Sequence, residues 1–191
     1  MSSPDEVLAF WLDEVGPKGW YGGGEALDAE VSRRFGDLWQ AATEGACALW
    51  LTYPTGTLAY IVVTDQFPRN MFRDDARAFA TDTIARAAAK VAVDRGWDLR
   101  IDEPARQFFY MPMMHSENLS DQDRCVRLML ARMPRTGANN LLHAKAHREV
   151  IRRFGRFPTR NAALGRTSNA GEQAYLDDGG YLAVVRALEA A

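Results

Sequence analysis

The fold class is decided by the stretch LTYPTGTLAYIVVTDQF, residues 51–67. Within it, residues 60–64 (YIVVT) combine the β-branched and aromatic side chains that favour strands. No second segment of similar composition could pair with it, and a strand without a partner is unstable in water. The sequence therefore predicts a buried helix from about Thr55 to Phe67, and with it an all-α protein.

Helix signals recur along the rest of the chain. Ser3, Pro4 and Glu6 have the order of a capped helix start, and the apolar pattern that follows ends at Gly16. Residues 17–24 (PKGWYGGG) are rich in helix breakers and are expected to form a loop. Apolar side chains at helical spacing predict further helices at 27–43, 76–95, 103–111, 120–133, 138–154, 170–177 and 179–190. Helices joined by short loops predict one domain over residues 1–191, built as an array of antiparallel helix pairs.

Composition and charge narrow the class of protein. The chain has 191 residues, of which 47% are hydrophobic and 25% charged, as in ordinary soluble proteins. A net charge of −2 argues against a nucleic-acid or acidic-membrane partner. No signal peptide or membrane-spanning run is recognisable, and Cys47 and Cys125 match no metal-binding spacing. We therefore expect a cytoplasmic protein with both cysteines reduced.

Two Phe-Pro motifs resemble each other: DQFPRNMFR at 65–73 and FGRFPTRNAALGR at 154–166. Because proline disfavours helical geometry in the residue before it, Phe67-Pro68 and Phe157-Pro158 are each expected to end a helix. The arginine after each corner could then bind a carboxylate or phosphate with two hydrogen bonds. Alternatively, each arginine pairs with a carboxylate of a neighbouring helix and serves only to hold the corner.

The chain has three histidines, His115, His143 and His147. His143 and His147 are four residues apart and share a helix face, but the glutamate of an H-E-x-x-H motif is missing, so no metal site is predicted. His115 and Glu117 are expected on a loop between helices, where site residues are commonly found. The alternative for this loop is local capping, with Ser116 or Ser120 holding helix ends.

Several segments together resemble a known family. They are Phe10-Trp11, Arg34-Phe35, DQFPRNMFR, PMMHSE with Gln122, and FGRFPTRN followed by AALGR. In this order, and over nearly the whole chain, they are similar to the bacterial family called domain of unknown function 924. The resemblance implies an all-α, superhelical array of antiparallel helix pairs that is tetratricopeptide-like, and it implies no activity. His147 matches a family histidine, whereas His143 does not, and Thr159 stands where the family usually has histidine.

The favoured hypothesis is that these motifs converge on one concave pocket that binds a small anionic molecule or an acidic peptide end. The expected ligand-binding residues are Asp65, Gln66, Arg69, Asn70, Gln122, Arg156, Arg160 and Asn161. His115, Glu117 and His147 would supply hydrogen bonds or proton transfer beside the ligand.

Two alternatives stay open. In the first, the pocket belongs to a hydrolase or transferase that uses His147 or Glu117 as acid–base, while arginines stabilise negative charge. In the second, the protein is a helical-repeat adaptor for a partner protein, although the sequence has no clear 34-residue period. No cofactor is predicted, and the sequence leaves the oligomeric state open.

Overall fold

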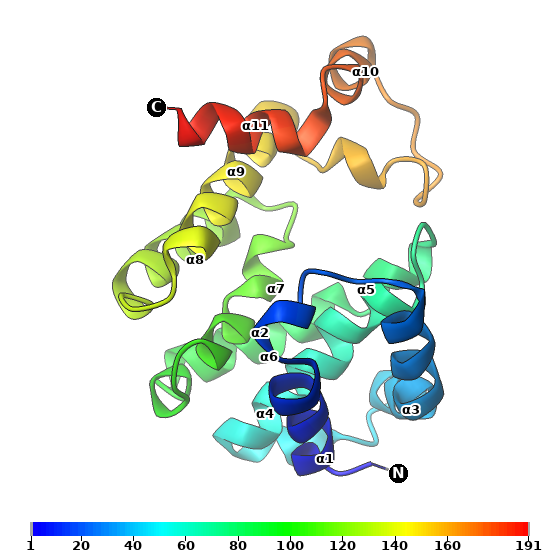
Figure 1. The fold of residues 1–191 in the computed structure, drawn as a ribbon, viewed down its shortest axis with the longest axis vertical. Helices are drawn as coiled ribbons and strands as arrows, with labels where there is room; N and C mark the ends of the chain where they lie inside the picture. Colours follow the sequence, from blue (N-terminus) through cyan, green and yellow to red (C-terminus); the bar gives the residue numbers. More distant parts are fainter. Residues whose placement is uncertain (1, 191) are drawn as a thin grey trace. The chain divides into compact units, whose positions relative to one another are not determined.

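The computed structural model describes residues 2–190, and every regular element among them is helical (Figure 1). This confirms the all-α prediction. Clustering of the backbone divides the chain into two compact units, here called unit 1 (up to Pro112) and unit 2 (from Met113). The single-domain organisation stays a prediction.

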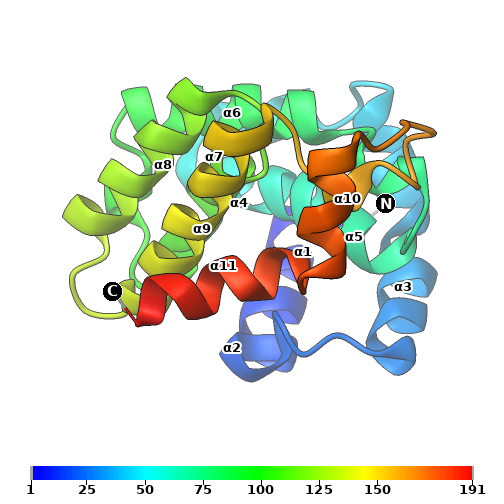
Figure 2. The same ribbon diagram turned by 90° about the horizontal axis from the view of Figure 1, so that it is seen from above.

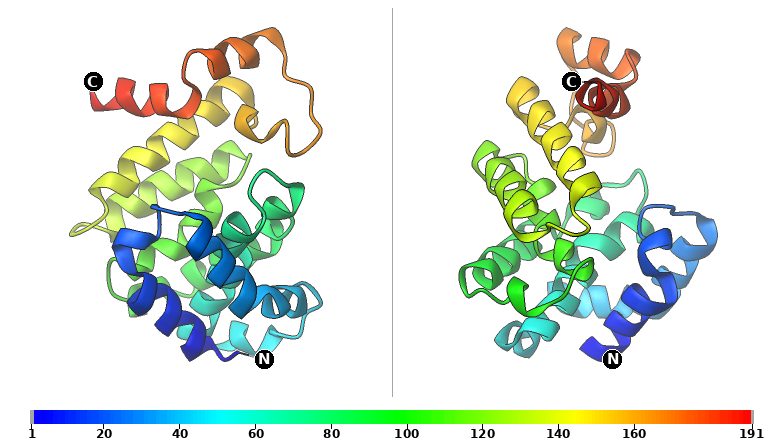
Figure 3. Two further views of the ribbon diagram at one scale, coloured as in Figure 1. Left: turned by 45° about the vertical axis from the view of Figure 1, so that its right-hand side comes forward. Right: turned by 60° about the vertical axis from the view of Figure 1, so that its left-hand side comes forward.

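Unit 1 is built around α4 (Pro54–Ile61), which packs against both α1 (Pro4–Leu8) and α6 (Asp82–Asp94). The helix α3 (Glu25–Thr43) lies along α5 (Phe67–Met71), as the blue and teal helices of Figure 3 show. The remaining helical segments of unit 1 are η1 (Ala9–Val15), α2 (Gly16–Gly19), η2 (Ala48–Thr52), η3 (Val62–Gln66), η4 (Ala76–Phe79), η5 (Asp98–Arg100) and η6 (Ala105–Phe109). The short helix α7 (Met111–Met114) contains the boundary between the units.

Buried aromatic rings hold these helices together. Phe35 of α3 stacks on Phe67 of α5 with ring centroids 4.7 Å apart, and Phe10 of η1 lies 5.0 Å from Phe35. Trp11 meets Phe67 edge-on at 5.5 Å. Each such pair stabilises the fold by about 0.5–1.5 kcal/mol beyond its buried area.

The amino-terminal helix begins as predicted and ends differently. The Ser3 hydroxyl accepts a hydrogen bond from the Glu6 amide, and the Glu6 carboxylate accepts one from the Ser3 amide, which confirms the capping box. The loop predicted for 17–24 is wrong at its start, because Gly16–Gly19 form α2. Pro17 suits the first turn of a helix, and the buried Trp20 anchors this turn by donating to the Trp11 carbonyl at 2.6 Å.

The stretch that decides the fold is helical, as predicted, but its end was predicted wrongly. Backbone helix continues from α4 through the π-helical η3 into α5, so Phe67-Pro68 is not a corner. In η3 the Phe67 amide reaches back five residues to the Val62 carbonyl, which widens the turn before the proline. The Thr64 carbonyl, which loses its partner at Pro68, instead accepts from the Thr81 hydroxyl.

Two other predicted helices of unit 1 are broken into pieces. The segment 76–95 is divided into η4 and α6, and the chain leaves α6 at Gly96 with a φ of +68°. The segment 103–111 forms only the short η6 and the beginning of α7.

Unit 2 contains the helical pair α8 (Leu119–Arg132) and α9 (Ala138–Phe154), which run side by side (Figure 1). The helix α11 (Gly180–Glu189) packs across α9, as Figure 2 shows from above, and α10 (Ala170–Asp177) precedes it. The core of this unit consists of Ala146, Val150, Ile151, Phe157, Tyr175, Val184 and Val185.

The ends of the unit 2 helices follow local sequence. The helix α9 spans the predicted residues and ends at Gly155, whose φ of +70° is left-handed and favours glycine. Phe157 is extended, so the second Phe-Pro corner exists as predicted, before the short η7 (Pro158–Arg160). The helix α10 lies where the sequence predicts a helix, and Asn169 and Glu172 form a capping box at its start.

Candidate functional site

The first Phe-Pro motif lies in unit 1, where its arginine is held by an acid. Both terminal nitrogens of Arg69 donate to Asp82 Oδ1 at 3.0 Å, and Nη1 also donates to the carbonyl oxygens of Asp65 and Ala78. The Asp65 carboxylate is fully buried and accepts from Gln66 Nε2 at 2.6 Å. These contacts tie η3 to α5 and α6, as expected for an arginine that holds its segment in place.

Asn70 is similarly engaged within unit 1. Its side-chain amide donates to Asp28 of α3 at 2.8 Å, and Arg73 also bonds to Asp28. The hydrogen bond from Arg73 lowers the pKa of Asp28, which keeps this carboxylate ionised. Asp65, Gln66, Arg69 and Asn70 thus all have partners inside unit 1, which favours a structural role for this motif.

The second Phe-Pro motif lies in unit 2, where Arg156 pairs with a carboxylate of α10. Arg156 Nε lies 2.6 Å from Glu172 Oε1, and Nη2 lies 2.8 Å from Oε2. Asn161 donates to Ser168 at 3.0 Å and approaches Glu172 Oε2 at 3.4 Å. Glu172 is 1% exposed, and the bonds from Arg156 and the Asn169 amide lower its pKa to about 2. These residues connect the corner to the start of α10.

Arg166 joins the second corner to the loop that carries His115 and Glu117. Its Nη1 and Nη2 donate to the two carboxylate oxygens of Glu117 at 2.8 and 2.9 Å. The Phe157 amide donates to Glu117 at 2.8 Å. Burial alone would raise the pKa of Glu117, but these hydrogen bonds outweigh burial and lower it. A carboxylate so occupied is better suited to positioning the corner than to accepting a proton.

Four side chains of unit 2 lie close together, and we call them the His–Arg cluster: His115, His147, Phe157 and Arg160. The ring centroids of His115 and His147 are 6.3 Å apart, and those of His147 and Phe157 are 5.5 Å apart. The Arg160 guanidinium lies 4.6 Å from the Phe157 ring centroid and donates to the His115 carbonyl at 2.9 Å. Unit 2 therefore brings three of the predicted site residues into one cluster.

His147 is neutral in this cluster, and its tautomer is fixed. Burial, helped by the nearby His115 and Arg160, lowers the pKa of His147 to about 3. Its Nδ1 lies 2.9 Å from the His143 carbonyl, which can only accept, so Nδ1 carries the proton. The lone pair is therefore on Nε2. His143 has a different role, because its Nδ1 is bonded to the Tyr181 hydroxyl at 2.6 Å.

Gln122 of α8 supports the same loop and leaves one atom without a partner. The residue is fully buried, and its Nε2 donates to the carbonyls of Met114 and Ser116 at 2.6 and 2.7 Å. These two acceptors fix the orientation of the amide. Among the described residues no group donates to Gln122 Oε1, and a buried acceptor of this kind is uncommon.

The predicted convergence of both Phe-Pro motifs on one pocket stays a prediction, because the motifs belong to different units. A cavity of about 360 Å³ does occur within unit 2 between α9, α10 and α11. Its lining includes Glu149, Arg153 and Asp178 and none of the predicted site residues. Within residues 2–190, no three or more His, Cys, Asp or Glu side chains are grouped so that they could hold a metal ion. In the same range, no helix is long and apolar enough to cross a membrane.

Sequence reasoning missed the acids that hold the arginines. Neither Glu172, which binds Arg156, nor Asp82, which binds Arg69, lies in a motif that predicts this contact. Arg166 lies in the quoted motif, but its partner Glu117 is 49 residues away in sequence. Local sequence cannot specify such pairs.

Comparison with known proteins agrees with the fold and the motifs. A solved structure from Agrobacterium tumefaciens, described as the protein of unknown function ATU0120, is 38% identical in sequence, with a TM-score of 0.85. The similarity covers 92% of this chain and 97% of that one. No curated protein matches significantly. Residues 7–180 match the family described as bacterial protein of unknown function (DUF924). With most of its length matched, the chain belongs to this family.

Proposed function

We propose that unit 2 binds a small anion, the phosphate or carboxylate group of a small molecule or of an acidic peptide end, at the His–Arg cluster. The observation that carries this proposal is the approach of the His115 and His147 rings to 6.3 Å beside the Arg160 guanidinium. A protonated imidazole at this place would be repelled by the guanidinium, and a bound anion would reverse that repulsion.

Binding is coupled to a proton. With Nδ1 of His147 committed to the His143 carbonyl, Nε2 faces an anion with a lone pair unless it is protonated. Nε2 of His147 must therefore take up a proton from the solvent when the anion binds, or receive one from the ligand. The hydroxyl of hydrogen phosphate can supply such a proton. The pKa of the His147 ring is about 3 in the folded protein without a ligand. The affinity of the protein for a fully ionised ligand therefore falls as the pH rises.

The other arginines of the motif support the site indirectly. Arg156 and Arg166 neutralise Glu172 and Glu117, and these pairs hold the corner that carries Phe157 and Arg160. Gln122 adds a buried carbonyl oxygen that could accept from a ligand hydroxyl.

Titration calorimetry with inorganic phosphate, and with a short peptide ending in aspartate, tests the proposal. Saturable binding to the natural protein should be lost in Arg160→Gln. Arg152→Gln is the matched control, because Arg152 is exposed on α9 and, within residues 2–190, pairs only with Glu149 in a surface ion pair. Should Arg160→Gln fail to fold, ring NMR signals of His115 and His147 in the natural protein must shift on phosphate addition. Absence of both binding and shifts would reject the proposal.

A second candidate, an acid–base hydrolase or transferase, is favoured by one observation. The fixed tautomer of His147 leaves a lone pair on Nε2, which a general base requires, and a bound negatively charged substrate would raise the low pKa of this buried ring. In this candidate Arg160 stabilises negative charge on the substrate. A panel of phosphate and carboxyl esters tests it: turnover that His147→Gln abolishes would support catalysis, whereas anion binding without turnover would leave a binding protein.

We further propose that the helices are arranged as antiparallel pairs in a tetratricopeptide-like manner. The helices α8 and α9 form one such pair. We also propose that the protein works in the cytoplasm. Cys47 and Cys125 are both free and buried, which suits a reducing compartment.

A further inference from the structure

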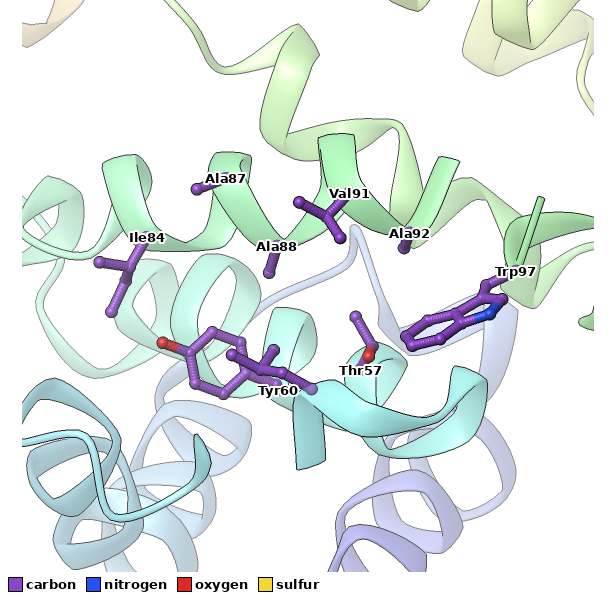
Figure 4. Close-up of a pocket in the computed structure, with 9 residues that line it drawn as sticks. Thr57, Tyr60, Ile84, Ala87, Ala88, Val91, Ala92 and Trp97 are labelled. Carbon is purple, nitrogen blue, oxygen red and sulfur yellow. The ribbon is translucent and has the colours of Figure 1, made fainter. Parts of the chain in front are cut away.

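Unit 1 contains a cavity that the His–Arg cluster does not use. This cavity measures about 330 Å³ and lies between α4 and α6. Figure 4 shows Ile84, Ala88 and Val91 of α6 on one side, with Thr57 and Tyr60 opposite. Trp97 closes one end. An apolar cavity of about 150 Å³ is enough to bind benzene, so this one has room for a larger ring system.

The lining excludes a charged ligand. None of the nine side chains that line the cavity is acidic or basic, and most are aliphatic or aromatic. A charged group held against these walls would lose part of its hydration without gaining a counter-ion, which is unfavourable. Alanines on α6 leave a flat wall, and the rings of Tyr60 and Trp97 supply aromatic surface.

One polar atom in the lining is unused. Tyr60 is 7% exposed, and among the described residues its hydroxyl has no hydrogen-bond partner. The Thr57 hydroxyl, by contrast, is occupied, because it donates to the Tyr53 carbonyl at 2.9 Å. Burial raises the pKa of the Tyr60 hydroxyl, so it remains a protonated donor that can also accept.

We infer that unit 1 carries a separate binding site, between α4 and α6, for a small neutral aromatic molecule with one hydrogen-bonding group that meets Tyr60. The apolar walls would supply most of the affinity, and the phenol would orient the ligand. This site lies in unit 1, whereas the proposed anion site lies in unit 2. It has an uncharged lining and shares no residue with the anion site.

Two probes of similar shape separate these contributions: 4-methylphenol, which has a hydroxyl, and toluene, which lacks one. Binding to the full chain is followed by calorimetry and by NMR shifts of Ala88, Val91 and Trp97. Tyr60→Phe should weaken the binding of 4-methylphenol about fivefold, as expected for the loss of one hydrogen bond, and leave the affinity for toluene unchanged. Ala88→Leu should fill the cavity and abolish binding of both probes.

Ala29→Leu is the matched control, because Ala29 is an exposed alanine of α3 in the same unit and does not line the cavity. It should leave both affinities unchanged. Benzoate, which has similar size but carries a charge, should not bind. The inference is overturned if neither probe binds saturably, if Ala88→Leu binds as the natural protein does, or if Tyr60→Phe affects both probes equally.

Discussion

Glu117 accepts two hydrogen bonds from Arg166, at 2.8 and 2.9 Å, and a third from the Phe157 amide at 2.8 Å. This pair fastens the loop of His115 to the corner of Phe157 and Arg160, so it sets the geometry of the His–Arg cluster. Its contribution is structural, and stability measurements can test it.

Glu117→Gln should lower the free energy of unfolding by about 1–3 kcal/mol, because Arg166 loses a charged partner in a partly buried place. Chemical denaturation measures the change. Glu149→Gln is the control: it breaks the surface pair with Arg152 and should cost less than about 0.5 kcal/mol. Equal effects of the two substitutions would show that the Glu117 pair has no special importance.

The buried His147 predicts a dependence of stability on pH. The unfolded ring binds a proton near its ordinary pKa of 6.5, whereas the folded ring stays neutral down to about pH 3. Stability is therefore complete above pH 6.5 and falls as the pH decreases toward 3. Between pH 6.5 and about pH 4 the natural protein should lose about 3 kcal/mol more than His147→Gln, measured by denaturation at each pH. Parallel pH profiles for the two proteins would contradict a buried neutral ring.

Thr81 should be important for the continuous helix through Pro68. Thr81→Val keeps the shape of the side chain but removes the donor to the Thr64 carbonyl and the acceptor for the Trp39 indole. We expect a loss of about 1–3 kcal/mol in the free energy of unfolding. Thr43→Val, which removes an exposed hydroxyl at the end of α3, should change stability by less than about 0.5 kcal/mol. A loss no larger than that of the control would mean that the Thr64 carbonyl is satisfied in another way.

The capping box of α10 gives a prediction about stability. Asn169→Ala removes the acceptor for the Glu172 amide and should cost about 1 kcal/mol. Asn169→Asp, which keeps an acceptor at the same place, should restore most of this loss. If alanine and aspartate behave alike, the cap does not contribute.

These cases show what the sequence could and could not predict. The ends of α9 and α10 were predicted because Gly155 and Asn169 act on their own helix termini. The continuous helix through Pro68 was not predicted. It depends on the Thr81 hydroxyl, which donates to the Thr64 carbonyl 17 residues earlier in the sequence. A local pattern carries no information on such a contact.

The same distinction applies to the site. The sequence predicts that His115, on a loop between helices, and His147, on a helix, lie near one another, and unit 2 brings the two rings together. The pairing of Arg69 and Arg156 with Asp82 and Glu172 was foreseen only as a general alternative, since no pattern specifies which carboxylate reaches which guanidinium. Of the predicted arginines, Arg160 is the one that borders both histidines.

The most direct test of anion binding at the His–Arg cluster is a crystal structure with arsenate, a phosphate analogue that is located by its anomalous scattering. We predict an anomalous peak within hydrogen-bonding distance of the Arg160 guanidinium and of His147 Nε2. Arsenate found only elsewhere, or not at all while these two side chains keep the arrangement described here, would contradict the account.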